Sequence, residues 1–110
     1  MNGSIDDDTV TVSSAQFVDL NTIDLGAGGN VLNVLAEGDI TAATTPIINN
    51  VGEGNLVGDG ADNSITLTGA QLDAIISGSG GIELGGGNDV INITSSSADL
   101  NALSLSLIHI

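Results

Sequence analysis

Four short stretches of the chain repeat one pattern, an Asp or Asn followed by alternating apolar and polar residues. They read DTVTV, NVLNV, NSITL and DVINI, and their first residues, here called anchors, lie 22, 33 and 26 residues apart. Alternation with a period of two predicts a β-strand with one buried and one outward face. The anchors are Asp8, Asn30, Asn63 and Asp89, and the apolar positions form two predicted columns, Val10, Leu32, Ile65 and Ile91, and Val12, Val34, Leu67 and Ile93.

A second motif follows three of these strands. It reads SSAQF at 13–17, TGAQL at 68–72 and SSADL at 96–100. A Ser or Thr placed three residues before Gln or Asp is similar to a helix capping box, so we expect one or two helical turns at each position, with Phe17, Leu72 and Leu100 pointing inward. The second repeat carries the looser LAEGDI and then an insertion that contains Pro46.

These units predict the fold class. Units of 22–33 residues are long for a two-strand coil and suit a three-sided one. One unit cannot bury its apolar face, whereas stacked units bury a continuous core. An antiparallel sandwich would need hairpin turns between neighbouring strands, and the similar strands recur instead at coil spacing. We therefore expect a mainly β protein, a parallel β-solenoid (β-helix-like or β-roll-like) with short helical corners of one to two turns.

The charge balance restricts the partners of the chain. Fourteen residues are Asp or Glu and none is Lys or Arg. Such a chain repels phosphate and anionic lipid, which argues against nucleic-acid binding and against membrane attachment, and no window is long enough to insert as a transmembrane helix. The carboxylates must stay solvated or share a cation, and Ca²⁺ is the cation that suits carboxylate and carbonyl oxygens best. A merely acidic, soluble surface is the alternative.

Glycine–acid loops precede three of the strands, and here a resemblance appears. LGGGNDVIN, from Leu84, is similar to the repeats-in-toxin (haemolysin-type calcium-binding) nonapeptide at Gly85, Gly87, Asp89 and Ile91. VGDGADNSI, from Val57, matches it at Gly58, Gly60 and Asp62, although the internal alignment makes Asn63 the anchor of that loop. LGAGGNVLN keeps Gly26, Gly28 and Leu32 but has Asn30 where the family has Asp.

The resemblance implies a function for these loops. In that family, glycine carbonyls and the Asp carboxylate bind Ca²⁺ between successive turns. Carried over to this chain, the resemblance implies metal ligands at Gly85, Gly87, Asp89, Gly58, Asp59, Gly60 and Asp62, and it implies a structural repeat segment of a large secreted or cell-surface bacterial protein such as an adhesin. The alternative is that the glycines only turn the chain, while Asn30, Asn63 and Asp89 satisfy backbone amides. The acidic run at 5–8 likewise allows a solvated strand start or a terminal cation site.

We expect no enzymatic activity. Nucleophilic catalysis needs a base beside the nucleophile, and the chain has one His and no Lys. Asp59 and Asp62 could pair as in a glycosidase, but the chain lacks the basic and aromatic residues that bind sugars. The alternative function is a metal-free solenoid that binds a glycan or ice through an outward polar ladder of Thr9, Thr11, Ser64, Thr66, Asn92 and Thr94. The other expected partners are neighbouring repeats of the same chain and a cell-surface ligand.

The end of the chain differs from the rest. The last six residues, LSLIHI, resemble the translated end of a sequencing-library adapter, and they contain the only histidine, His109. We therefore expect residues 1–104 to form a degenerate four-copy repeat segment of a larger protein, and residues 105–110 to be a non-native tail.

Overall fold

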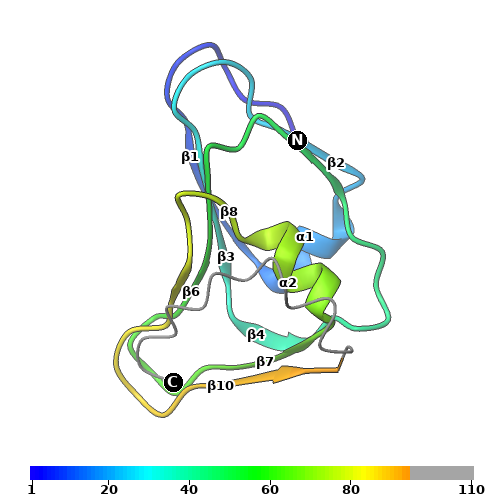
Figure 1. Cartoon of the computed structure of the whole chain (residues 1–110), viewed down its shortest axis with the longest axis vertical. Helices are drawn as coiled ribbons and strands as arrows, with labels where there is room; N and C mark the ends of the chain where they lie inside the picture. The colour runs from blue at the N-terminus through cyan, green and yellow to red at the C-terminus, as the bar shows by residue number, and fades with distance from the viewer. Residues whose placement is uncertain (95–110) are drawn as a thin grey trace.

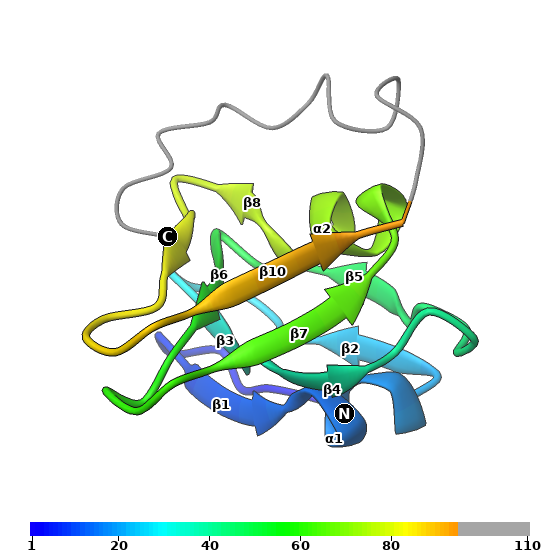
Figure 2. The same ribbon diagram turned by 90° about the horizontal axis from the view of Figure 1, so that it is seen from below.

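The structure is a computed structural model that describes residues 1–94. This part of the chain is mainly β, with strands that pair in parallel in three sheets, and it has two short helices (Figures 1 and 2). In Figure 1, β1, β3 and β6 run along one side of the molecule, β4, β7 and β10 along a second and β2 along a third. The largest sheet holds β1 (Thr9–Ser13), β3 (Val31–Leu35), β6 (Glu53–Val57), β8 (Ser77–Gly78) and β9 (Ile82–Glu83). The second holds β4 (Glu37–Asp39), β7 (Ser64–Leu67) and β10 (Val90–Ile93), and the third holds β2 (Thr22–Asp24) and β5 (Ile47–Asn49).

The four predicted strands form, and each begins directly after its anchor. Thr9 of β1 pairs with Val31 of β3, and Ser64 of β7 pairs with Val90 of β10, in both cases in parallel. Among the strands of residues 1–94, only β8 runs antiparallel to its neighbour, β6. The antiparallel sandwich considered from the sequence is therefore wrong.

The predicted columns of four are also wrong, because they divide between two sheets. Val10 pairs with Leu32 and Ile65 with Ile91, but the partner of Leu32 on the other side is Gly54 of β6 rather than Ile65. The anchor pattern missed β6 because Gly52 precedes it and a glycine occupies its first inward position. A Cβ at Gly54 would collide with the backbone carbonyl oxygen of Ile75 and would lie 2.6 Å from Ser77 Oγ, so the strand cannot carry an apolar residue there.

Both predicted corners within the described residues are helical. Helix α1 spans Ser14–Asp19 and α2 spans Gly69–Ile75. Each begins with a complete capping box, Ser13 with Gln16 and Thr68 with Gln71. Phe17 and Leu72 are fully buried, as expected, whereas Leu100 lies outside the described residues. The looser segment LAEGDI forms β4 instead of a helix.

The core lies between the sheets and the helices. Burial of its aliphatic side chains is the main force that stabilises such a fold, since the chain has no Lys or Arg side chain to pair with its acids. Its fully buried large side chains are Phe17, Ile23, Leu25, Leu32, Val34, Leu56, Ile65, Leu67, Leu72 and Ile75. Neither helix in residues 1–94 has the length and apolar character needed to cross a membrane.

The outward polar residues do not form one stripe. Thr9 and Thr11 lie on the largest sheet, whereas Ser64, Thr66 and Asn92 lie on the second sheet. The amides on these strands are engaged in bonds along the stack: Asn55 Nδ2 donates to Asn33 Oδ1 at 3.0 Å, and Asn92 Nδ2 donates to Thr66 Oγ1 at 3.4 Å. The single ladder that the sequence suggested is therefore corrected to two separate polar faces.

Candidate functional site

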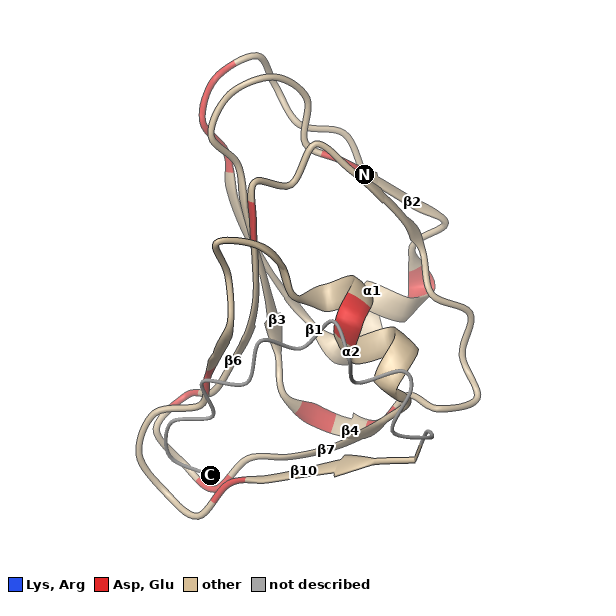
Figure 3. Cartoon of the chain, viewed as in Figure 1, with Lys and Arg blue, Asp and Glu red and all other residues tan. Residues whose placement is uncertain are grey.

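Glycine- and acid-rich loops stack in two pairs at opposite ends of the strands of the largest sheet. In the first pair, residues 3–8 lie against residues 25–30, just before β1 and β3. In the second pair, residues 58–63 follow β6 and lie against residues 84–89, which follow β9. Figure 3 shows that acidic residues gather at both of these corners.

The two loop pairs are built from the same contacts. In the first pair, Gly29 N–H donates to Asp7 Oδ1 at 2.7 Å, and Asp8 N–H donates to Asn30 Oδ1 at 2.9 Å. In the second pair, Asn88 N–H donates to Asp62 Oδ1 at 2.7 Å. There Asn63 N–H donates to Asp89 Oδ1 at 2.8 Å. Asn30 and Asp89 therefore play equivalent parts, as the ungapped alignment of their loops predicts.

The side chain of Asn30 is a buried hydrogen-bond donor in the first loop pair. It is 1% exposed. Its Nδ2 lies 3.0, 2.9 and 3.3 Å from the carbonyl oxygens of Leu25, Gly26 and Ala27, and 3.0 Å from that of Asn50 in the next loop. Four backbone carbonyls therefore converge on one side-chain donor, and the amide joins its own loop to the loop that contains Asn50.

Asp89 occupies the equivalent position in the second pair, and it is 6% exposed. Its Oδ1 accepts from Asn63, but an ionised carboxylate has no hydrogen to donate. The amide nitrogen of Asn30 is thus replaced by a carboxylate oxygen. The loop has no side-chain donor at the place where the first pair uses one.

The structure decides the register of the loop at residues 58–63. Asn63 lies against Asp89, so Asn63 is the anchor and Asp62 lies opposite Asn88. The internal alignment is therefore confirmed for this loop, and the family register, which would give Asp62 the same place as Asp89, is one residue off.

The glycines at the turns are needed for backbone reasons. Gly28 and Gly87 have φ of 103° and 98°, a region that L side chains rarely adopt. A Cβ on Gly87 would lie 2.6 Å from the carbonyl oxygen of Ala61, and one on Gly28 would lie 2.6 Å from that of Asp6. Each glycine therefore allows its loop to approach the loop stacked beneath it.

The remaining predicted site residues also take part in the turns. Gly60 and Gly85 have φ of 89° and 75°, and Gly58 lies against the carbonyl of Leu84. Asp59 Oδ1 accepts from Ala61 N–H at 3.1 Å and from Asn63 Nδ2 at 3.2 Å. The sequence-based interpretation of these loops as turns is confirmed, while metal binding stays a prediction.

No group of three or more His, Cys, Asp or Glu side chains within residues 1–94 converges on one point. A Ca²⁺ ion needs about six to eight oxygens, so in these loops it would have to draw most of them from backbone carbonyls and water. Of the loop carboxylates, Asp59, Asp62 and Asp89 each use Oδ1 in the hydrogen bonds above.

Asp24 makes hydrogen bonds that the sequence did not predict. Its Oδ1 accepts from Asn50 Nδ2 at 2.8 Å and from Gly26 N–H at 2.9 Å. These bonds, the one from Asn50 first, hold the pKa of Asp24 below its ordinary value of 3.8. Asn50 itself has φ of 59°, a left-handed conformation that Asn adopts more readily than most other residues.

The sequence reasoning also missed the N-terminal loop at residues 3–8. We considered its acids as a strand start or a terminal cation site, yet Asp7 and Asp8 repeat the contacts of Asp62 and Asn63. The signal was present, because Gly3 precedes Asp8 by the same five residues that separate Gly58 from Asn63.

Comparison of the chain with protein-family models, with curated proteins and with solved structures gives no match.

Proposed function

We propose that the chain is a non-enzymatic structural repeat segment of a large secreted or cell-surface bacterial protein, a β-solenoid whose second loop pair binds Ca²⁺. The solenoid is supported by strand pairing at coil spacing. Thr9 pairs with Val31 and Val31 pairs with Glu53, each 22 residues further on, and Ser64 pairs with Val90 after 26 residues. Repeats of this kind bury a core only when stacked, so neighbouring repeats are the natural partners.

One comparison carries the calcium proposal, that between Asn30 and Asp89. In the first loop pair, the amide of Asn30 supplies hydrogens to loop carbonyls. In the second pair, a carboxylate stands at the aligned position and cannot do so. A cation would satisfy both the carboxylate and the carbonyls, and Ca²⁺ prefers this mixture of oxygens to any other ligand set.

The charge of the chain supports the same proposal. With fourteen acids and no Lys or Arg, the chain has a formal net charge of −14 at pH 7. Self-repulsion of this kind opposes compaction. An ion that binds only the folded chain stabilises it, by about 2.7 kcal/mol at a hundredfold excess over Kd.

A reciprocal exchange of the two side chains tests the proposal. Asp89→Asn supplies the missing amide, so we expect it to raise the melting temperature without calcium and to reduce the further rise in millimolar Ca²⁺. Asn30→Asp removes the amide from the first pair, so it should lower stability without calcium and increase the response to Ca²⁺. The measurement is thermal unfolding followed by circular dichroism, in Ca²⁺ and in chelator.

Two controls make the outcome specific. Asp19→Asn removes one charge from the exposed end of α1 and should leave the calcium response unchanged. Mg²⁺ should act much more weakly than Ca²⁺, because it demands a tight octahedral site. A calcium response that is the same in the parent chain, Asp89→Asn and Asp89→Ala would refute calcium binding at this loop.

A further inference from the structure

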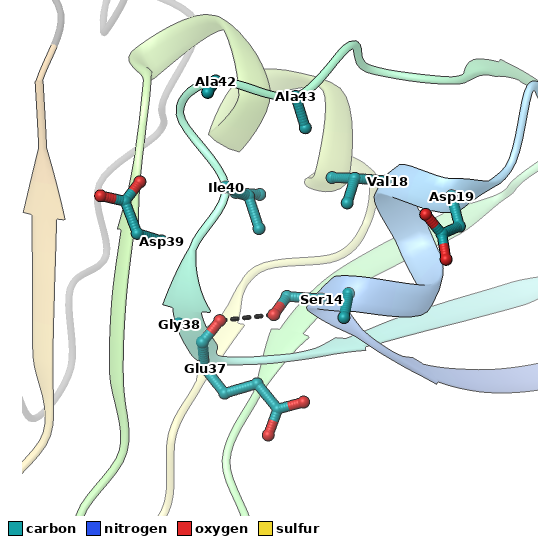
Figure 4. A pocket seen from close by; sticks show the side chains of 10 residues that line it. Ser14, Val18, Asp19, Glu37, Gly38, Asp39, Ile40, Ala42 and Ala43 are labelled. Atoms are coloured by element: carbon teal, nitrogen blue, oxygen red, sulfur yellow. Dashed lines mark hydrogen bonds between the residues drawn. The ribbon is translucent and has the colours of Figure 1, made fainter.

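A groove with an apolar floor opens between α1 and the segment that contains β4. It has a volume of about 700 Å³. In Figure 4, the side chains of Val18, Ile40 and Ala43 point toward the centre of this groove, whereas the carboxylates of Asp19 and Glu37 lie at its margin. The groove lies away from both loop pairs, so the function proposed above does not use it.

The groove exists because successive turns differ at this corner. The first turn passes from β1 directly into α1, whereas the next forms β4 and then a tight turn in which Ala43 N–H donates to Ile40 O at 3.1 Å. Helix α1 and the turn that follows β4 therefore differ in shape, and the groove lies between them. The one hydrogen bond between α1 and β4 in the structure joins Ser14 Oγ to the carbonyl of Glu37.

Strand β4 presents a partly open edge to the groove. Among residues 1–94, β7 is the only strand that pairs with β4. Ile40 N–H donates to Thr66 O of β7, while the carbonyl of Glu37 faces α1. With Asp39 opposite Thr66 and Ile40 N–H donating to Thr66 O, the N–H and C=O of Asp39 point away from β7, toward the groove side. On the same edge, the carbonyl of Glu37 already accepts from Ser14 Oγ. An edge of this kind accepts a further extended segment.

The margin of the groove is acidic. Asp19, Glu37 and Asp39 are all exposed, and the chain has no Lys or Arg side chain that could pair with them. Thr41 donates to Asp39 through its hydroxyl at 2.6 Å and its N–H at 3.0 Å, and these two bonds keep the pKa of Asp39 below its ordinary value. A second copy of the chain, with the same net charge of −14, would be repelled.

The geometry points to a binding site for an extended basic peptide, which adds to the partly open edge of β4, places aliphatic side chains over Val18 and Ile40, and directs Lys or Arg side chains to Asp19 and Glu37. Backbone pairing supplies affinity in this mode, and alternate side chains supply specificity. Residues 1–110 do not supply this peptide, because they contain no Lys or Arg.

Fluorescence anisotropy with three labelled hexapeptides tests the site on the full chain in calcium-containing buffer. The first alternates Lys or Arg with Val, the second replaces Val by Ser, and the third keeps the first sequence but carries N-methyl groups on alternate amides. We expect binding of the first peptide only. Equal binding of all three would overturn the proposal, because it would show attraction by net charge without pairing or apolar contact.

Matched variants locate the binding. Asp19→Asn with Glu37→Gln should weaken binding about five- to tenfold, since exposed ion pairs each contribute modestly. The control variant, Asp73→Asn with Glu83→Gln, removes the same charge from exposed positions elsewhere and should weaken binding by less than about threefold. Equal weakening by both pairs would overturn the site.

A filled groove gives an independent test. Ala42→Phe places a ring in the groove and should abolish binding, whereas Ala70→Phe makes the same change on the exposed face of α2 and should not. Circular dichroism of each variant shows that the fold is kept. Retained binding by a folded Ala42→Phe variant would contradict the proposal, as would concentration-dependent dimerisation that this substitution removes, since that would identify a second copy as the occupant.

Discussion

Replacing Asn30 by alanine should destabilise the fold by about 3–5 kcal/mol. The side chain is 1% exposed and accepts a hydrogen bond from Asp8 N–H at 2.9 Å. Its two amide hydrogens serve four carbonyl oxygens at 2.9–3.3 Å, so two full bonds and two weaker contacts are lost with it. Each buried polar group left without a partner costs about 1–3 kcal/mol, and water can reach only part of this loop.

Urea unfolding followed by circular dichroism measures this loss, at a fixed calcium concentration. Asn88→Ala is the matched control, because Asn88 is exposed in the second loop pair, and it should change the free energy of unfolding by less than about 0.5 kcal/mol. Most small domains are stable by only about 5–15 kcal/mol, so the Asn30 variant should unfold at a much lower urea concentration. A loss below about 1 kcal/mol would refute the view that this amide joins its own loop to the loop that contains Asn50.

Three further predictions concern the turns and the ends. Gly87→Ala should lower the free energy of unfolding, measured in urea, by about 2–3 kcal/mol. Gly86→Ala should lower it much less, because φ of Gly86 is not positive and the nearest atom is 3.8 Å from the added Cβ. Equal losses would contradict the close approach of the loops. The pKa of Asp24 is lowered from 3.8, so its charge stabilises the fold above that value and the gain is lost as the pH falls through the lower folded pKa. Asp24→Asn should therefore be less stable than the parent at pH 6, and the difference should shrink as the pH falls through the lowered pKa of Asp24. A difference that does not change with pH would contradict this. Deletion of residues 105–110 should shift the melting temperature by no more than about one degree, while a fall of several degrees would identify a native strand.

The sequence alone predicted the features that depend on local chemistry. The anchors, the alternating strands and the capping boxes at Ser13 and Thr68 follow from short patterns whose physical causes are local, and they are confirmed. The stacking order depends on contacts between distant residues. Gly54 interrupts the apolar alternation of β6, so the anchor pattern did not predict that this strand pairs with β3.

The candidate site was predicted in a similar way. The glycine turns were visible in the sequence, because only glycine tolerates the backbone at Gly28 and Gly87. The partner loop at residues 3–8 gave a weaker signal, because Ser4 stands where the second pair has Asp59 and only one glycine remains, and the matching spacing of Gly3 and Asp8 was overlooked. The groove beside α1 could not be predicted, because it arises from a mismatch between two turns and not from any motif.

The most direct test of calcium stabilisation is the thermal unfolding of the full chain in millimolar Ca²⁺, compared with NaCl of equal ionic strength. Specific binding at about a hundredfold excess over Kd adds about 2.7 kcal/mol, which corresponds to a rise of about 10–20 °C for a domain of this size. We predict that rise in Ca²⁺ and only a small one in NaCl. If NaCl reproduces the whole effect, screening of the fourteen acids explains it, and the loops at residues 58–63 and 84–89 are turns without a metal.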